Sequence, residues 1–128
     1  MGPFPHDAPA AVISEHNPMG TDGFEFVEFA HPEPEKLHAL FRLMGFTAVA
    51  RHKTKAITVY RQGDVNYLVN EQPGTHGYDF VAAHGPCAPS MAFRVVDAKR
   101  AYERALSLGA EPADATSSQK TLDVPAIK

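Results

Sequence analysis

The sequence predicts a mixed α+β fold built on a βαβββ module, with one complete copy and the start of a second. A β-prone segment precedes an amphipathic helix, and three further β-prone stretches follow that helix. The strand and helix then recur at a fixed spacing, the 64 residues that separate Gly45 from Gly109. A chain of 128 residues is long enough to bury one modest core, so a single domain is expected.

The first module follows a proline-rich stretch, residues 1–21, that we expect to be an extended arm. A strand is predicted at residues 23–30, where aromatic and β-branched side chains are concentrated. A helix is predicted between Pro34, which suits a first helical turn, and Gly45, which suits a left-handed terminator. Its apolar residues lie three and four apart, on one face: Leu37, Leu40, Phe41 and Met44.

A meander of three short strands is predicted after this helix and completes the first module at residues 22–72. The β-prone stretches are residues 46–52, 56–61 and 65–70. Residues 73–89 are rich in glycine and proline, so we expect a connecting loop with a short apolar stretch at residues 78–83.

An incomplete second module is predicted at residues 90–128. A strand at residues 91–96 leads into Asp97, a suitable N-cap, and into a helix whose apolar face matches that of the first helix. Only residues 121–127 remain to offer a further strand. A sheet without its last strands leaves unpaired edge groups, so we expect this chain to be a portion of a longer protein.

Composition argues against several partners and locations. The 12 Lys and Arg residues are outnumbered by 15 Asp and Glu residues, which predicts no basic surface for nucleic acid or for an anionic membrane. No apolar run approaches the ~20 residues that cross a bilayer, and no signal-peptide pattern opens the chain, so a cytoplasmic protein is expected. Cys87 is expected to be an ordinary loop thiol, because no base lies beside it in sequence.

No metal site is predicted from the spacing of the seven histidines. His31 and His38 are separated by two prolines, which break the helix that would align them. We expect His31 at a strand end and His38 in solvent on the helix. His52 has a cationic residue on each side, which disfavours a bound cation. The others are expected in solvent: His6, His16, His76 and His84.

No catalytic or cofactor-binding residue is predicted either. Glu25 and Glu28 lie three apart, so a strand would place them on opposite faces, which argues against an acid/base pair. The patterns GxSxG, CxxC and HExxH and the P-loop are absent, so the hydrolase, zinc-protease and nucleotide-binding classes lack their defining residues.

The order of strand, helix and three-strand meander, followed by its repetition, resembles the vicinal-oxygen-chelate superfamily of glyoxalases, bleomycin-resistance proteins and extradiol dioxygenases. The resemblance implies one such domain at residues 22–128, in which two modules pair. It also implies that a metal-binding histidine would stand on the first strand of a module, seven residues before Asp97 in the second copy. Ser90 occupies that position, and Phe26 occupies the matching position of the first copy. Neither can hold iron, so no metal site is expected on this chain.

A more specific likeness lies in the run NPMGTDGFEFVEFA at residues 17–30, with LMGF at 43–46 and VNYLVNEQ at 65–72. These residues resemble the amino-terminal domain of the bacterial 4-hydroxyphenylpyruvate dioxygenase family, over residues 13–128. The resemblance implies that a full-length member uses Fe(II) and O₂ to convert 4-hydroxyphenylpyruvate to homogentisate and CO₂ in tyrosine and phenylalanine catabolism. In that family two histidines and one glutamate of the carboxy-terminal domain bind the iron.

We therefore expect the amino-terminal portion of such a dioxygenase, inactive alone. The expected partners are the catalytic domain of the same chain, further copies of the chain and a 2-oxo acid substrate. Two alternatives stay open. The first is a free-standing, non-catalytic chelate-fold module that dimerises or binds a small molecule. The second is part of a hydroxymandelate synthase, which uses the same substrate on a similar scaffold.

Overall fold

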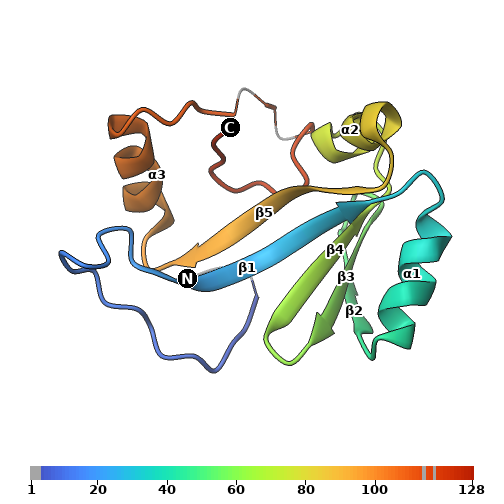
Figure 1. Cartoon of the computed structure of the whole chain (residues 1–128), viewed down its shortest axis with the longest axis horizontal. Helices are drawn as coiled ribbons and strands as arrows, with labels where there is room; N and C mark the ends of the chain where they lie inside the picture. Colours follow the sequence, from blue (N-terminus) through green and yellow to red (C-terminus); the bar gives the residue numbers. More distant parts are fainter. Residues whose placement is uncertain (1–3, 114, 117) are drawn as a thin grey trace.

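A five-stranded mixed sheet organises the chain, as a computed structural model shows for residues 4–113, 115–116 and 118–128 (Figure 1). The strand order is β2-β3-β4-β1-β5; β1 runs parallel to β4, and the other neighbours are antiparallel. The α+β prediction is confirmed. The elements are β1 (Thr21–Ala30), α1 (Pro34–Leu43), β2 (Thr47–Arg51), β3 (Ile57–Gln62), β4 (Val65–Asn70), α2 (His76–His84), β5 (Cys87–Val95) and α3 (Ala98–Ser107).

The predicted strand, helix and meander of the first module are all present, and α1 covers one face of the sheet. Leu37 and Phe41 of α1 are buried against a cluster from the sheet and the turn before it: Phe46, Tyr60 and Val69. Gly45 has φ of +90°, a backbone conformation that L side chains rarely adopt, so it ends the helix as predicted.

The opposite face of the sheet carries a second apolar cluster, which the chain's own ends cover. Its buried members are Phe26, Ile57, Val59 and Leu68. Phe4 of the amino-terminal arm and Leu122 of the carboxy-terminal segment pack against them. The Phe4 and Phe26 rings meet edge to face with centroids 6.2 Å apart. The arm is extended as expected, and it is anchored to the sheet at this point.

The predicted connecting loop contains a helix, which corrects the sequence-based expectation. α2 follows Thr75 and packs its Gly77 against Glu28 of β1 so closely that an added Cβ would lie 2.1 Å from the Glu28 carboxylate. The helix packs against β1 and β5, and the flanking glycines and prolines conceal it in the sequence. β5 also begins earlier than expected, so Cys87 lies at the start of a strand.

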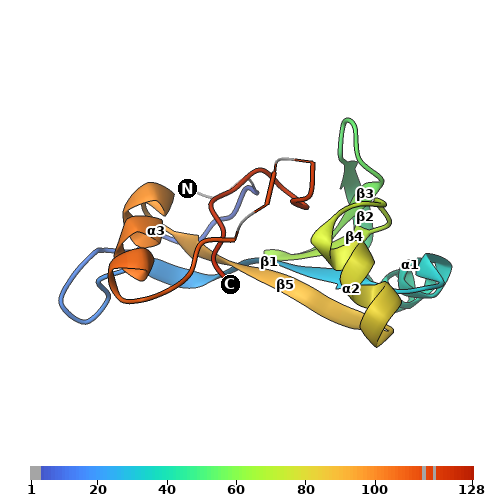
Figure 2. The ribbon, with the colours of Figure 1, turned by 90° about the horizontal axis from the view of Figure 1, so that it is seen from above.

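The sequence repeat is visible in the structure as the antiparallel pair of β1 and β5. Val27 faces Met91, the residue 64 positions later, with Phe26 opposite Ala92 and Glu28 opposite Ser90 on either side. An approximate two-fold axis therefore passes through the Val27 and Met91 pair. α1 and α3 lie at opposite ends of this two-stranded ribbon (Figures 1 and 2).

α3 begins as predicted at Asp97, whose carboxylate accepts a hydrogen bond from the Arg100 backbone N–H at 3.0 Å. The strand predicted at residues 121–127 does not form. An isolated bridge pairs Ile127 with Pro112, and Thr121 and Leu122 instead contact side chains of the sheet. No helix within the described ranges has both the length and the apolarity of a membrane span.

Candidate functional site

The two positions at which the superfamily resemblance would place metal ligands lie on the paired strands β1 and β5. Phe26, on β1, is 6% exposed within the apolar cluster, and a phenyl ring offers no donor atom. Ser90, on β5, donates its hydroxyl to Glu28 Oε2 at 2.6 Å. The part of the chain that the structure describes holds no group of three or more His, Cys, Asp or Glu residues suited to a metal ion. These residues do not fit Fe(II).

Glu28 is the centre of a buried polar cluster on the same face. Its side chain is 1% exposed and accepts three hydrogen bonds, from Asn70 Nδ2 at 2.8 Å and from the Ser90 and Thr121 hydroxyls at 2.6 Å each. Asn70 also donates to the Thr75 hydroxyl at 2.9 Å. Neutral donors thus satisfy the carboxylate, and the cluster ties β4, β5 and the carboxy-terminal segment to β1.

Glu25 and Glu28 are both buried, although they contact different parts of the chain. Glu25 Oε1 accepts the Phe4 backbone N–H at 2.8 Å, which fixes the amino-terminal arm. The Glu25 contact lies in the middle of β1, and the Glu28 cluster lies near the carboxyl end of the strand. The geometry therefore gives each carboxylate a structural contact of its own.

Cys87 faces Ala30 across the β1–β5 pair, close to the Glu28 cluster. Burial, and to a lesser extent the negative charge of Glu28, raise the pKa of the Cys87 thiol. The neutral thiol is a poor nucleophile, which agrees with the expectation of an ordinary cysteine, although the residue lies in a strand and not in a loop.

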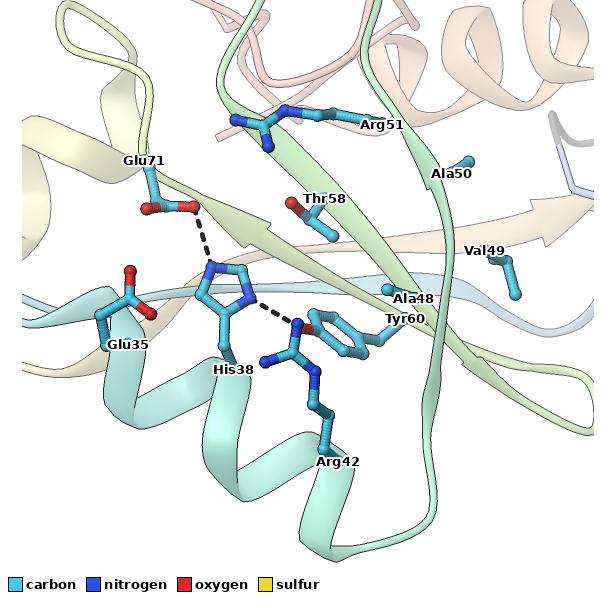
Figure 3. A pocket seen from close by; sticks show the side chains of 10 residues that line it. All are labelled: Glu35, His38, Arg42, Ala48, Val49, Ala50, Arg51, Thr58, Tyr60 and Glu71. Atoms are coloured by element: carbon cyan, nitrogen blue, oxygen red, sulfur yellow. Dashed lines mark hydrogen bonds and ion pairs between the residues drawn. The ribbon is translucent and has the colours of Figure 1, made fainter.

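A second candidate site is a groove of about 600 Å³ between α1, β2, β3 and the residue that follows β4 (Figure 3). The lining combines small alanine side chains on β2 with charged side chains from α1, from β2 and from the residue after β4. The lining residues are Glu35, His38, Arg42, Ala48, Val49, Ala50, Arg51, Thr58, Tyr60 and Glu71.

His38 lies in this groove, which corrects the expectation that it would be in solvent. Its side chain is 12% exposed, with Nδ1 2.7 Å from the buried Tyr60 hydroxyl and Nε2 2.9 Å from Glu71 Oε2. A neutral ring that accepts from Tyr60 and donates to Glu71 satisfies all three groups. The partners lie 22 and 33 residues away in sequence, so no local pattern marks the contact.

The remaining histidines make local or solvent contacts. His31 Nδ1 accepts the Glu33 N–H at 2.8 Å, and His52 Nδ1 accepts the Lys55 N–H at 3.1 Å. His6 is half-buried, which differs from the prediction. The other three are exposed as expected: His16, His76 and His84.

The chain matches known proteins over most of its length. The model of the family described as "Hydroxyphenylpyruvate dioxygenase, HPPD, N-terminal" matches residues 15–128. A 4-hydroxyphenylpyruvate dioxygenase of Pseudomonas sp. (strain P.J. 874) is 48% identical over 112 residues, which cover 88% of this chain and 31% of that protein. The corresponding protein of Pseudomonas aeruginosa is 42% identical over 121 residues, with coverage of 92% and 34%. The chain thus spans about a third of the length of these relatives.

Three further similarities concern other functions and the fold. A 3-dehydroshikimate dehydratase of Pseudomonas putida is 32% identical over 122 residues, covering 94% of this chain and 19% of the dehydratase. A solved xylose isomerase-like TIM barrel/4-hydroxyphenylpyruvate dioxygenase fusion protein superimposes with a TM-score of 0.76 at 32% identity, covering 94% of this chain and 18% of the fusion. Methylmalonyl-CoA epimerase from Mycobacterium tuberculosis shares the fold, with a TM-score of 0.56, 15% identity and coverage of 77% and 75%.

Proposed function

The chain belongs to the hydroxyphenylpyruvate dioxygenase amino-terminal family, and from this premise we propose that it serves as the amino-terminal domain of a 4-hydroxyphenylpyruvate dioxygenase. The whole protein would convert 4-hydroxyphenylpyruvate and O₂ to homogentisate and CO₂ in tyrosine and phenylalanine catabolism. It would depend on Fe(II) and work in the cytoplasm. The observation that carries the proposal is the 48% identity to a 4-hydroxyphenylpyruvate dioxygenase. The match covers 31% of the length of that protein.

The role proposed for these residues is architectural. The positions that would ligate a metal hold Phe26 and a Ser90 engaged with Glu28, so the iron would belong to a carboxy-terminal domain of the same protein. Phe4 and Leu122 cover the face of the sheet that carries Phe26, which supports a structural role for this face in place of a catalytic one. Residues 1–128 alone are expected to be inactive.

Completion of the second module on the outer side of β5 is part of the proposal. In the first module β4 pairs in parallel with β1, Val27 facing Tyr67. The two-fold relation would place an equivalent strand beside Met91, on the side of β5 away from β1. Large apolar side chains that are now more than half exposed would then be covered: Phe24, Met91 and Phe93. Further copies of the chain are the other proposed partners.

The test is an assay of the intact protein, purified with Fe(II) and supplied with 4-hydroxyphenylpyruvate. We expect O₂ consumption, CO₂ release and homogentisate as the product, and no turnover by residues 1–128. Formation of 4-hydroxymandelate instead would identify the synthase alternative. Absence of any O₂-dependent turnover by the iron-loaded intact protein would refute a dioxygenase and favour a free-standing module.

A second candidate is the matching part of a 3-dehydroshikimate dehydratase. The match to the Pseudomonas putida dehydratase covers 94% of this chain, which supports it, and the identity of 32% is lower than the 42–48% to dioxygenases. Dehydration of 3-dehydroshikimate by the intact protein, followed by ultraviolet absorbance, separates the two candidates.

A further inference from the structure

The groove between α1 and β2 has the volume of a small-molecule site and is open to solvent on one side. Its volume of about 600 Å³ falls within the ~300–1,000 Å³ typical of ligand pockets. Tyr60 and Thr58 form a buried floor, at 0% and 9% exposure, while α1 and the exposed strand β2 form the two walls. Ala48 and Ala50 of β2 carry small side chains that leave the interior open.

Three hydrogen-bond donors line this groove without an acceptor of their own. Among the described residues, the side chains of Arg42, Arg51 and Thr58 make no hydrogen bond or ion pair, and Arg42 lies over the Tyr60 ring, 5.9 Å from its centroid. The guanidinium groups of Arg61 and Arg94 outside the groove, by contrast, each contact an aspartate. Arg100 and Arg104, exposed on α3, likewise make no side-chain hydrogen bond or ion pair among the described residues, but only in the groove do such donors surround one hollow.

The relative positions of these donors suit an oxyanion. Figure 3 shows Arg42 and Arg51 entering the groove from opposite walls, with the Thr58 hydroxyl between them on the floor. Planar guanidinium groups bind carboxylate and phosphate oxygens through paired charge-assisted hydrogen bonds. A threonine hydroxyl adds a neutral donor to such an anion.

The acidic residues of the groove narrow the class of ligand. Glu71 is held by His38, which is itself fixed by Tyr60, so this carboxylate already has a partner. Glu35 has no hydrogen-bond or ion-pair partner among the residues that the structure describes. Its position at the α1 wall favours a ligand that carries an ammonium or hydroxyl group beside its anionic end.

We propose that this groove is a binding site for a small carboxylate- or phosphate-bearing molecule, held by Arg42, Arg51 and Thr58. The site is separate from the face that carries Phe26 and Glu28. It lies at the β2 side of the sheet, and β5 forms the opposite edge. The proposal is thus independent of how the second module is completed and of the reaction of the whole protein.

The experiment is a titration of the intact protein at neutral pH with sodium phosphate, sodium acetate and glycine, against sodium chloride at matched ionic strength. Chemical shifts of backbone amides report the location of binding. We expect saturable shifts confined to α1, β2 and β3 with at least one probe. Preference for phosphate or for acetate distinguishes the two oxyanion sources, and tighter binding of glycine than of acetate supports the contact with Glu35.

Substitutions at exposed positions separate this site from general charge attraction. Arg42→Gln and Arg51→Gln are each expected to weaken binding about tenfold, the loss of one charge-assisted contact. Arg100→Gln, an exposed change on α3, is the matched control and should leave affinity unchanged. Absence of saturable shifts with all three probes would overturn the proposal, as would equal weakening by Arg100→Gln.

Discussion

The two faces of the sheet differ in how far their polar side chains are hydrogen-bonded within the protein. On the face that carries Phe26, every donor near Glu28 already has an acceptor, and the chain's own ends close the surface. In the groove beside α1, three donors have no acceptor among the described residues, and the space between them is open. Internal satisfaction stabilises a fold, whereas convergent unsatisfied donors are available to a ligand. We therefore expect polar substitutions on the first face to affect stability most, and those in the groove to affect the proposed ligand binding most.

Removal of the Glu28 carboxylate should cause the largest loss of stability and so tests the first face most directly. Glu28→Ala takes the acceptor from the Ser90 and Thr121 hydroxyls and leaves the Asn70 amide with its bond to Thr75 but without the one to Glu28, and we expect a loss of about 3 kcal/mol in the free energy of unfolding. Urea denaturation measures it. Glu103→Ala, on the exposed surface of α3, should change stability by less than about 0.5 kcal/mol. Similar midpoints for the two variants would mean that the cluster does not stabilise the fold.

A methyl group at Gly77 should have the next largest effect. Its Cβ would lie 2.1 Å from Glu28 Oε1, so α2 must move away from β1, at a cost of about 2 kcal/mol. The double variant with Glu28→Ala removes the atom that clashes, so its cost should be smaller than the sum of the two single changes. Strict additivity in the denaturation midpoints would contradict the close contact.

The groove should tolerate changes better, because its network is smaller and reaches solvent. Tyr60→Phe removes the hydrogen bond to His38 Nδ1, and we expect a loss of about 1 kcal/mol. Tyr67→Phe is the matched control, since its hydroxyl has no hydrogen bond with another described residue, and its stability should be unchanged. Thermal unfolding of both variants measures this. Equal stability of the two would mean that the hydrogen bond between His38 and Tyr60 does not stabilise the fold.

The reactivity of Cys87 gives the finest test. Its raised pKa means less thiolate at a given pH, so alkylation by iodoacetamide should be several-fold slower than for free cysteine, with the rate profile displaced to higher pH. Glu28→Gln removes a negative charge that contributes to this shift, so its profile should move back toward lower pH. An unchanged profile in Glu28→Gln, with Glu103→Gln as control, would show that the carboxylate does not affect the thiol.

Local sequence patterns predicted the elements whose causes are local. The helix between Pro34 and Gly45, the meander and the Asp97 cap depend on spacing, turn residues and capping within a few positions. α2 was missed because glycines and prolines flank it and its contacts on β1 lie far away in sequence, as Gly77 and Glu28 do at 49 positions apart.

The candidate site was less predictable than the fold. His38 was predicted to be in solvent because its two partners lie far away in sequence, on β3 and after β4. The strand predicted at residues 121–127 failed for a similar reason, since Thr121 and Leu122 contact side chains of the sheet instead of forming a strand. The absence of iron ligands at Phe26 and Ser90 remains a prediction.

The two-fold relation through Val27 and Met91 has a consequence for how the two copies can differ. Two identical modules paired in this way would set each Glu28 opposite a phenylalanine, because Ser90 occupies the position equivalent to Phe26. That arrangement would bury two carboxylates, and neither would accept a hydrogen bond from a hydroxyl on the opposite strand, as Glu28 does here from Ser90. A repeat within one chain escapes this symmetry, since one copy can keep the acid and the other can supply the donor. Divergence of the copies is therefore what lets this strand pair contain a buried glutamate.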